Sequence, residues 1–139
     1  MRFMVLVKAT KLSESGAPPS PEMLSEMGKF NQELIDAGIL LDANGLQPSS
    51  KGVRVEIAGG AKRNVVDGPF AEAKELVAGY WIWQCKSMQE AVEWVKRCPD
   101  PMQGEACAIE IRQISELDDF PDVPDSVKKQ ADAFAASKK

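Results

Sequence analysis

Apolar and polar residues alternate from Val53 to Ile57, a period of two that predicts a strand with one apolar face and one wet face. The turn at 58–62 contains two adjacent glycines, and a second strand at 63–66 ends in the β-branched Val65 and Val66, so the pattern predicts a hairpin. Short apolar runs predict four further strands, at 3–7, 39–46, 80–85 and 106–114.

Two other segments carry apolar residues at helical spacing. The first begins at Ser20 and Pro21, a favourable cap and first position, and ends at Gly38. Its apolar stripe, interpreted as core, comprises Met23, Met27, Phe30, Leu34 and Ala37. The second begins with a capping box formed by Ser87 and Glu90, and Pro99 ends it. The polar stretch at 11–19 is expected to be a loop.

The predicted order is strand, helix, strand, then the hairpin, then strand, helix, strand. Two β-α-β halves with helices on one face of a largely antiparallel sheet predict an α+β, ferredoxin-like βαββαβ fold with an additional hairpin strand. The uncovered sheet face needs a partner, and a second copy is the most economical source, so we expect a homodimer. Residues 1–114 form this domain, and 115–139 form a C-terminal extension, in which 126–136 is a candidate short helix. Two interpretations of the extension stay open: it is disordered, or Phe120 or Phe134 docks onto the partner subunit.

Composition narrows the class of protein. The chain has 139 residues, 44% of them hydrophobic and 27% charged, which is ordinary for one soluble domain. The net charge is -4 and no basic stripe alternates with aromatic residues, so we expect no direct binding to nucleic acid. The apolar run at the start is too short for a signal peptide or a membrane helix, and a cytoplasmic protein without membrane contact is expected.

The number and spacing of the cysteines and the absence of histidine argue against several kinds of catalytic and metal-binding site. The three cysteines, Cys85, Cys98 and Cys107, lack metal-site spacing, and their odd number argues against a complete disulfide framework. We expect buried thiols without catalytic function. The chain contains no histidine, so a Ser-His-Asp triad is excluded and no metal or other cofactor is expected.

The most informative segment is 65–80, where acidic, turn-forming and aromatic residues lie between two predicted strands. The first strand ends at Asp67, and the Gly-Pro dipeptide that follows predicts a helical turn over 70–77, closed by Gly79. Asp67 would then lie beside the N-terminus of this turn, where free N–H groups stabilise a carboxylate. Two interpretations stay open: Asp67 closes the turn, or it serves a ligand site.

The segment 65–80, together with motifs at 45–48, 90–94 and 109–112, resembles the YCII-related family and in particular its DGPF-containing branch. The resemblance extends over residues 1–114 and implies a dimeric α+β barrel, in which two sheets face each other and a pocket lies near the motif of each subunit. Family members with an assigned reaction look like lyases of small unsaturated acids that pair a histidine with the aspartate of the motif. Such a pair is excluded here, although a carboxylate base alone is not.

Two functional hypotheses follow. In the first, the protein binds a small anionic or carbonyl metabolite in a pocket beside the Asp67-Gly68-Pro69-Phe70 motif. The predicted ligand-binding residues are Arg63, Asp67, Glu72, Lys74 and Tyr80. In the second, a lyase-like enzyme uses Asp67 as the catalytic base for a small organic acid, and Tyr80 stabilises the oxyanion. The missing histidine favours binding over catalysis.

Overall fold

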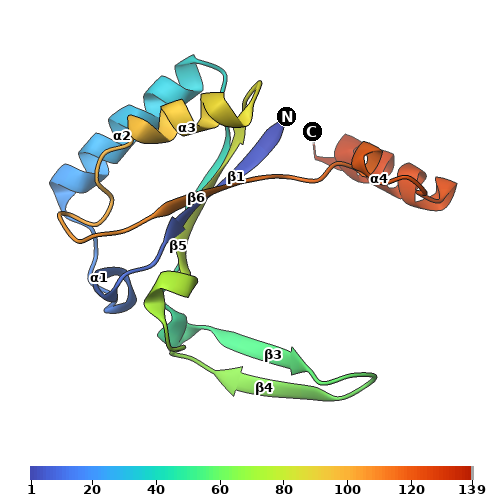
Figure 1. The fold of residues 1–139 in the computed structure, drawn as a ribbon, viewed down its shortest axis with the longest axis horizontal. Helices are drawn as coiled ribbons and strands as arrows, with labels where there is room; N and C mark the ends of the chain where they lie inside the picture. The colour runs from blue at the N-terminus through green and yellow to red at the C-terminus, as the bar shows by residue number, and fades with distance from the viewer. Residues whose placement is uncertain (139) are drawn as a thin grey trace.

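A four-stranded antiparallel sheet, with helices on one face, forms the body of the protein in a computed structural model that describes residues 1–138 (Figure 1). Lys139, the last residue of the predicted extension, lies outside the described residues. The strands are β1 (Arg2–Lys8), β2 (Leu40–Gly45), β5 (Val77–Gln84) and β6 (Ile109–Gln113). They lie in the order β2-β5-β1-β6, and each neighbouring pair is antiparallel. This arrangement is compatible with the predicted ferredoxin-like α+β fold.

Both long helices of the body begin at the predicted caps. The N–H of Met23 donates to Ser20 Oγ at 3.1 Å at the start of α2 (Pro21–Asp36). At the start of α3 (Met88–Lys96), the N–H of Glu90 donates to Ser87 Oγ at 3.1 Å. The Glu90 carboxylate accepts from the N–H of Lys86 at 3.0 Å, one residue earlier than an ideal capping box requires.

The core lies between the sheet and these two helices. Phe3 and Trp83 are completely buried, and the Phe30 ring of α2 meets the Trp81 and Trp83 rings edge-on, with centroids 6.0 and 6.2 Å away. The helical stripe is confirmed at Phe30 and Leu34, which are buried. Ala37 is exposed, because α2 ends at Asp36 and the chain turns away there.

The predicted hairpin is confirmed, but it forms a sheet of its own. β3 (Val53–Ile57) and β4 (Arg63–Asp67) pair with each other and project away from the body (Figure 1). Directly opposite residues of an antiparallel pair share a face, so the pairing of Val55 with Val65 places both on the same side. The apolar face of the hairpin comprises Val53, Val55, Ile57 and Val65, all more than half exposed.

Two local predictions are wrong. The stretch 11–19 begins with a short helix, α1 (Lys11–Glu14), because the Thr10 hydroxyl accepts from the N–H of Ser13 and caps it. The helical turn expected at 70–77 is reduced to a single 3₁₀ turn, η2 (Ala73–Glu75), since β5 already begins at Val77.

The C-terminal extension leaves the body after β6. It contains a short turn, η3 (Leu117–Asp119), and the helix α4 (Asp125–Ser137), which lies at the position of the candidate short helix, 126–136. The start of the extension is tied to β1, because Arg2 Nε donates to Glu116 Oε1 at 2.7 Å. No residue of α4 is buried, and α4 projects from the same side of the body as the hairpin (Figure 1). None of the helices within residues 1–138 has the length and apolar content that a membrane span requires.

Candidate functional site

A cavity of about 650 Å³ lies at the end of the sheet where β1 and β2 finish and β5 begins. Its wall also includes α1, the loop that follows α1, residues of α2 up to Asn31, and the turn at 101–103. Three methionines and a tryptophan make much of the apolar lining: Met23, Met27, Met102 and Trp81. The volume falls within the range of roughly 300–1,000 Å³ that is usual for small-molecule sites.

Polar groups line two sides of the cavity: Tyr80 and Asn44 lie on the sheet face away from the helices, and Asn31 lies on the face that α2 covers. The Tyr80 hydroxyl accepts a hydrogen bond from Asn44 Nδ2 at 3.1 Å and lies 3.4 Å from the Asp42 carboxylate, to which it donates. Asn31 is held by the indole of Trp81, whose Nε1–H donates to Asn31 Oδ1 at 2.9 Å. These groups are fixed by neighbours in the sheet and the helix, and they provide both donors and acceptors.

Glu14 at the end of α1 is the charged side chain that lines the cavity. Its carboxylate accepts two hydrogen bonds from Ser49, one from the hydroxyl and one from the backbone N–H at 2.9 Å. Among the described residues, no lysine or arginine contributes to the lining. The cavity is therefore apolar with a few polar contacts, and its one carboxylate is already hydrogen-bonded.

The Asp67-Gly68-Pro69-Phe70 motif lies next to this site, at the root of the hairpin. Here the chain packs against a 3₁₀ turn, η1 (Ser49–Lys51): the N–H of Phe70 donates to Ser49 Oγ at 3.0 Å. A Cβ atom on Gly68 would lie 1.8 Å from the Ser49 carbonyl oxygen, so only glycine allows this close approach. The guanidinium of Arg54 lies over the Phe70 ring, 3.8 Å from its centre. Ser49 thus connects the motif to Glu14.

The five predicted site residues are not brought together. Tyr80 lines the cavity, whereas Arg63, Asp67, Glu72 and Lys74 do not. Asp67 and Arg63 are exposed at opposite ends of β4, roughly 14 Å apart at about 3.4 Å per strand residue. Arg63 donates to the carbonyl oxygens of Gly60 and Lys62 at 2.7 and 2.9 Å.

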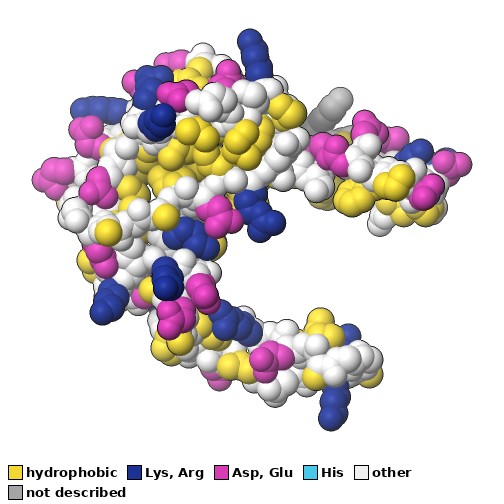
Figure 2. Space-filling view, viewed as in Figure 1, with side chains coloured by type: hydrophobic (Ala, Val, Ile, Leu, Met, Phe, Trp, Pro, Cys, Tyr) yellow, Lys and Arg dark blue, Asp and Glu magenta, His cyan; other side chains and the backbone are white. Residues whose placement is uncertain are grey.

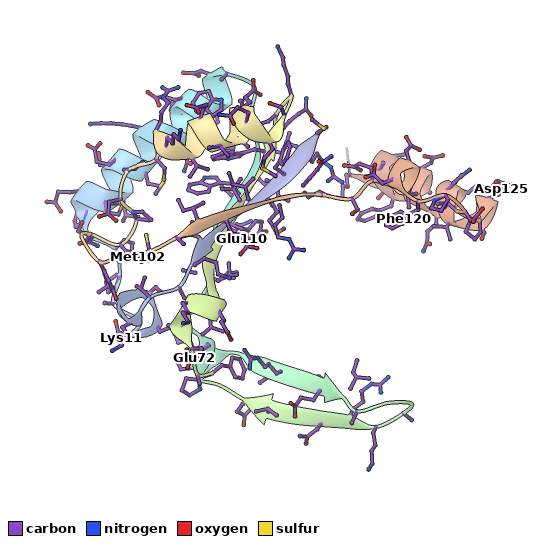
Figure 3. The ribbon with its side chains drawn as sticks, in the orientation of Figure 1. Lys11, Glu72, Met102, Glu110, Phe120 and Asp125 are labelled. Atoms are coloured by element: carbon purple, nitrogen blue, oxygen red, sulfur yellow. The ribbon has the colours of Figure 1, made fainter. Side chains whose placement is uncertain are left out.

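Glu72 and Lys74 lie at the bend between the hairpin and β5, where Figure 3 shows Glu72 at the hairpin root (Figure 3). Both side chains are exposed. Within residues 1–138 the Asp67 side chain has no hydrogen-bond partner, and no helical turn follows β4 before η2 begins at Ala73. The arrangement predicted for Asp67 beside a helical turn is therefore absent.

Sequence reasoning missed two residues of the site, Glu14 and Ser49. Glu14 lies in the stretch 11–19 that was expected to be a loop, and Ser49 lies where no element was predicted. The spacing of Thr10 and Ser13, which cap each other's backbone at α1, was the signal available for a helix that ends at Glu14. The contact between Glu14 and Ser49 joins residues 35 positions apart and has no local sequence signature.

The cysteines are poor nucleophiles. Burial raises the pKa of Cys85 and of Cys98 to about 11, with further contributions from Glu90 at Cys85 and from Cys107 and Asp100 at Cys98. Burial, Asp100 and Glu105 also raise the pKa of Cys107. Cys85 is buried as expected, but Cys107 is exposed, since the segment before β6 is not part of a strand. Among residues 1–138, no three Cys, Asp or Glu side chains are grouped as metal ligands.

A family model for the YCII-related domain matches residues 1–116, and the chain belongs to this family. A protein of Rhizobium meliloti (strain 1021), described only as uncharacterized, is 27% identical over 74 residues. The aligned stretch covers 53% of this chain and 59% of that protein. The family is the one that the motifs predicted, while membership in the DGPF-containing branch stays a prediction.

Proposed function

We propose that this protein binds a small uncharged organic molecule, such as a carbonyl compound of metabolite size, in the cavity beside Tyr80. The observation that carries the proposal is the combination of an apolar wall with a few fixed hydrogen-bonding groups in a volume of about 650 Å³. Tyr80 and Asn44 carry O–H and N–H donors that are bonded to Asp42 and to each other, and a ligand carbonyl would take the place of one of these partners.

The charges of the lining favour an uncharged ligand over an anion. An anion would meet the Glu14 carboxylate and no cation, because Arg63 and Lys74 lie outside the lining. Like charges in a partly apolar site repel strongly, whereas a carbonyl oxygen needs only a donor. Of the two ligand classes expected from the sequence, the carbonyl compound is therefore retained.

Two further predictions belong to this proposal. The sheet face opposite α2 and α3, called here the open sheet face, carries the half-buried Met4, Leu6 and Ile82, and it supports a homodimer in which two such faces meet. The lyase-like alternative stays a hypothesis. Asp67 lacks a neighbouring acid–base partner in the structure, so binding remains the function that the geometry supports best.

A thermal-shift screen with matched pairs of neutral carbonyl compounds and carboxylates tests the proposal. We expect neutral compounds to raise the melting temperature of the parent protein, and Tyr80→Phe to weaken their binding by about two- to tenfold, the usual value of one hydrogen bond. Asp67→Asn is the control and should bind them like the parent. If only carboxylates bind, or if Asp67→Asn loses the neutral compounds while Tyr80→Phe keeps them, the proposal is wrong.

A further inference from the structure

Besides the open sheet face, two apolar surfaces within residues 1–138 are left without cover. One is the apolar face of the hairpin, on which Val55 is 54% and Ile57 66% exposed. The other is a stripe on α4 formed by Val127, Ala131 and Phe134, at helical spacings of four and three. Phe134 is 61% exposed. Burying such side chains is worth about 25 cal/mol per Å², so both surfaces favour a partner.

The two surfaces lie on opposite sides of one wide opening. Figure 2 shows the chain as a C, with the hairpin as one arm, the extension with α4 as the other, and the body between them. Both arms point the same way, and α2 and α3 lie on the outer side of the sheet (Figure 1). Consider a two-fold axis that passes through the opening along the viewing direction of the figure. Rotation by 180° about this axis would place the α4 arm of each copy beside the hairpin arm of the other.

Length and charge support the same pairing. β3 has five residues and α4 has thirteen, so at about 3.4 and 1.5 Å per residue they are roughly 17 and 20 Å long. The hairpin segment 51–67 carries four basic and two acidic residues. The approach to α4, residues 116–125, carries five acidic residues and no basic one. α4 itself carries two acidic and two basic residues, so the attraction would come from its acidic approach lying near the basic hairpin, while the two apolar elements match in length.

We propose that in the homodimer the α4 helix of each copy packs on the apolar face of the partner's hairpin. The inference rests on the homodimer proposed above and adds a second contact to it. The family model ends at residue 116, so α4 lies outside the shared domain. The contact would therefore be a feature of this chain that its family relationship does not supply.

Thiol cross-linking between two singly substituted proteins tests the contact. Val55→Cys and Ala131→Cys are each made in a Cys107→Ser background, which removes the exposed native thiol, and the two proteins are mixed and treated with a short bismaleimide. We expect a covalent product that contains one chain of each kind. Glu56→Cys, on the opposite face of β3, is the matched control and should give much less product.

Sedimentation separates this inference from the homodimer itself. Phe134→Asp should raise the dimer dissociation constant by tenfold or more, whereas Ala136→Asp, on the far side of α4, should leave it nearly unchanged. If the parent protein is a dimer but gives no mixed product, or if Phe134→Asp does not weaken that dimer, the proposed contact between α4 and the partner's hairpin is wrong. The homodimer proposal would still stand. If Val55→Cys cross-links to itself, the two hairpins contact each other instead of α4, which also contradicts the proposed contact. A monomeric parent would overturn both proposals.

Discussion

The body sheet and the hairpin are built from similar strands but differ in what covers them. In β5, Trp81 and Trp83 alternate with half-buried residues, and both tryptophans are covered by α2 and α3. In β3, Val53, Val55 and Ile57 alternate just as regularly, yet all three are more than half exposed. An alternating pattern therefore shows that a strand has an apolar face, and it does not show which element covers that face.

The two sheets are expected to differ most in how much a substitution in each of them lowers the free energy of unfolding. Trp83→Ala should destabilise the protein by about 3–5 kcal/mol, because it empties the centre of the core. Within residues 1–138 the Trp83 indole N–H has no hydrogen-bond partner, so the loss is one of packing alone. Val55→Ala should cost less than about 0.5 kcal/mol when the protein is diluted to the monomer. Urea unfolding followed by circular dichroism measures both, and equal losses would contradict the comparison.

A substitution at the root of the hairpin should destabilise the protein more than a substitution along its strands. Gly68→Ala forces a Cβ atom against the Ser49 carbonyl and should destabilise the protein by about 1–3 kcal/mol. Gly28→Ala, in α2 with no atom within 4 Å of the added Cβ, is the control and should stabilise by roughly 0.5–1 kcal/mol. If Gly68→Ala unfolds at the same urea concentration as the parent, the hairpin root is not the tight junction described here.

The smallest expected effect concerns the link between the body and the C-terminal extension. The hydrogen bond from Arg2 lowers the pKa of Glu116 below its usual value of 4.5. A lowered pKa adds stability above pH 4.5, and this contribution is lost as the pH falls through the lowered value. Arg2→Gln should return the Glu116 pKa towards 4.5, as measured by NMR titration. An unchanged pKa would show that the pair does not form in solution.

Much of the body could be predicted from the sequence because its signals are local. The caps at Ser20 and Ser87 mark the starts of α2 and α3 correctly, and a backbone donor that needs an acceptor lies only three residues away in each case. The hairpin was equally clear from Val53 to Ile57 and from the two glycines in its turn.

The candidate site was harder to predict because it depends on contacts between distant parts of the chain. The cavity joins α1, α2, β2 and β5, and of the five ligand-binding residues predicted from the sequence only Tyr80 lines it. The glycine of the motif was interpreted as part of a turn into a helix. In the structure it is required by Ser49, nineteen positions earlier, whose carbonyl leaves no room for a side chain. Such a requirement is set by tertiary packing and leaves no periodic pattern.

The aromatic cluster of the core has a consequence for spectroscopy. All three tryptophans of the chain, Trp81, Trp83 and Trp94, belong to the body, and the Phe30 ring lies within 6.5 Å of each of their rings. Neither the hairpin nor the extension contains an indole. Intrinsic fluorescence will therefore report the melting of the body and the filling of the cavity beside Trp81, while opening or closing of the two arms will leave the emission spectrum nearly unchanged.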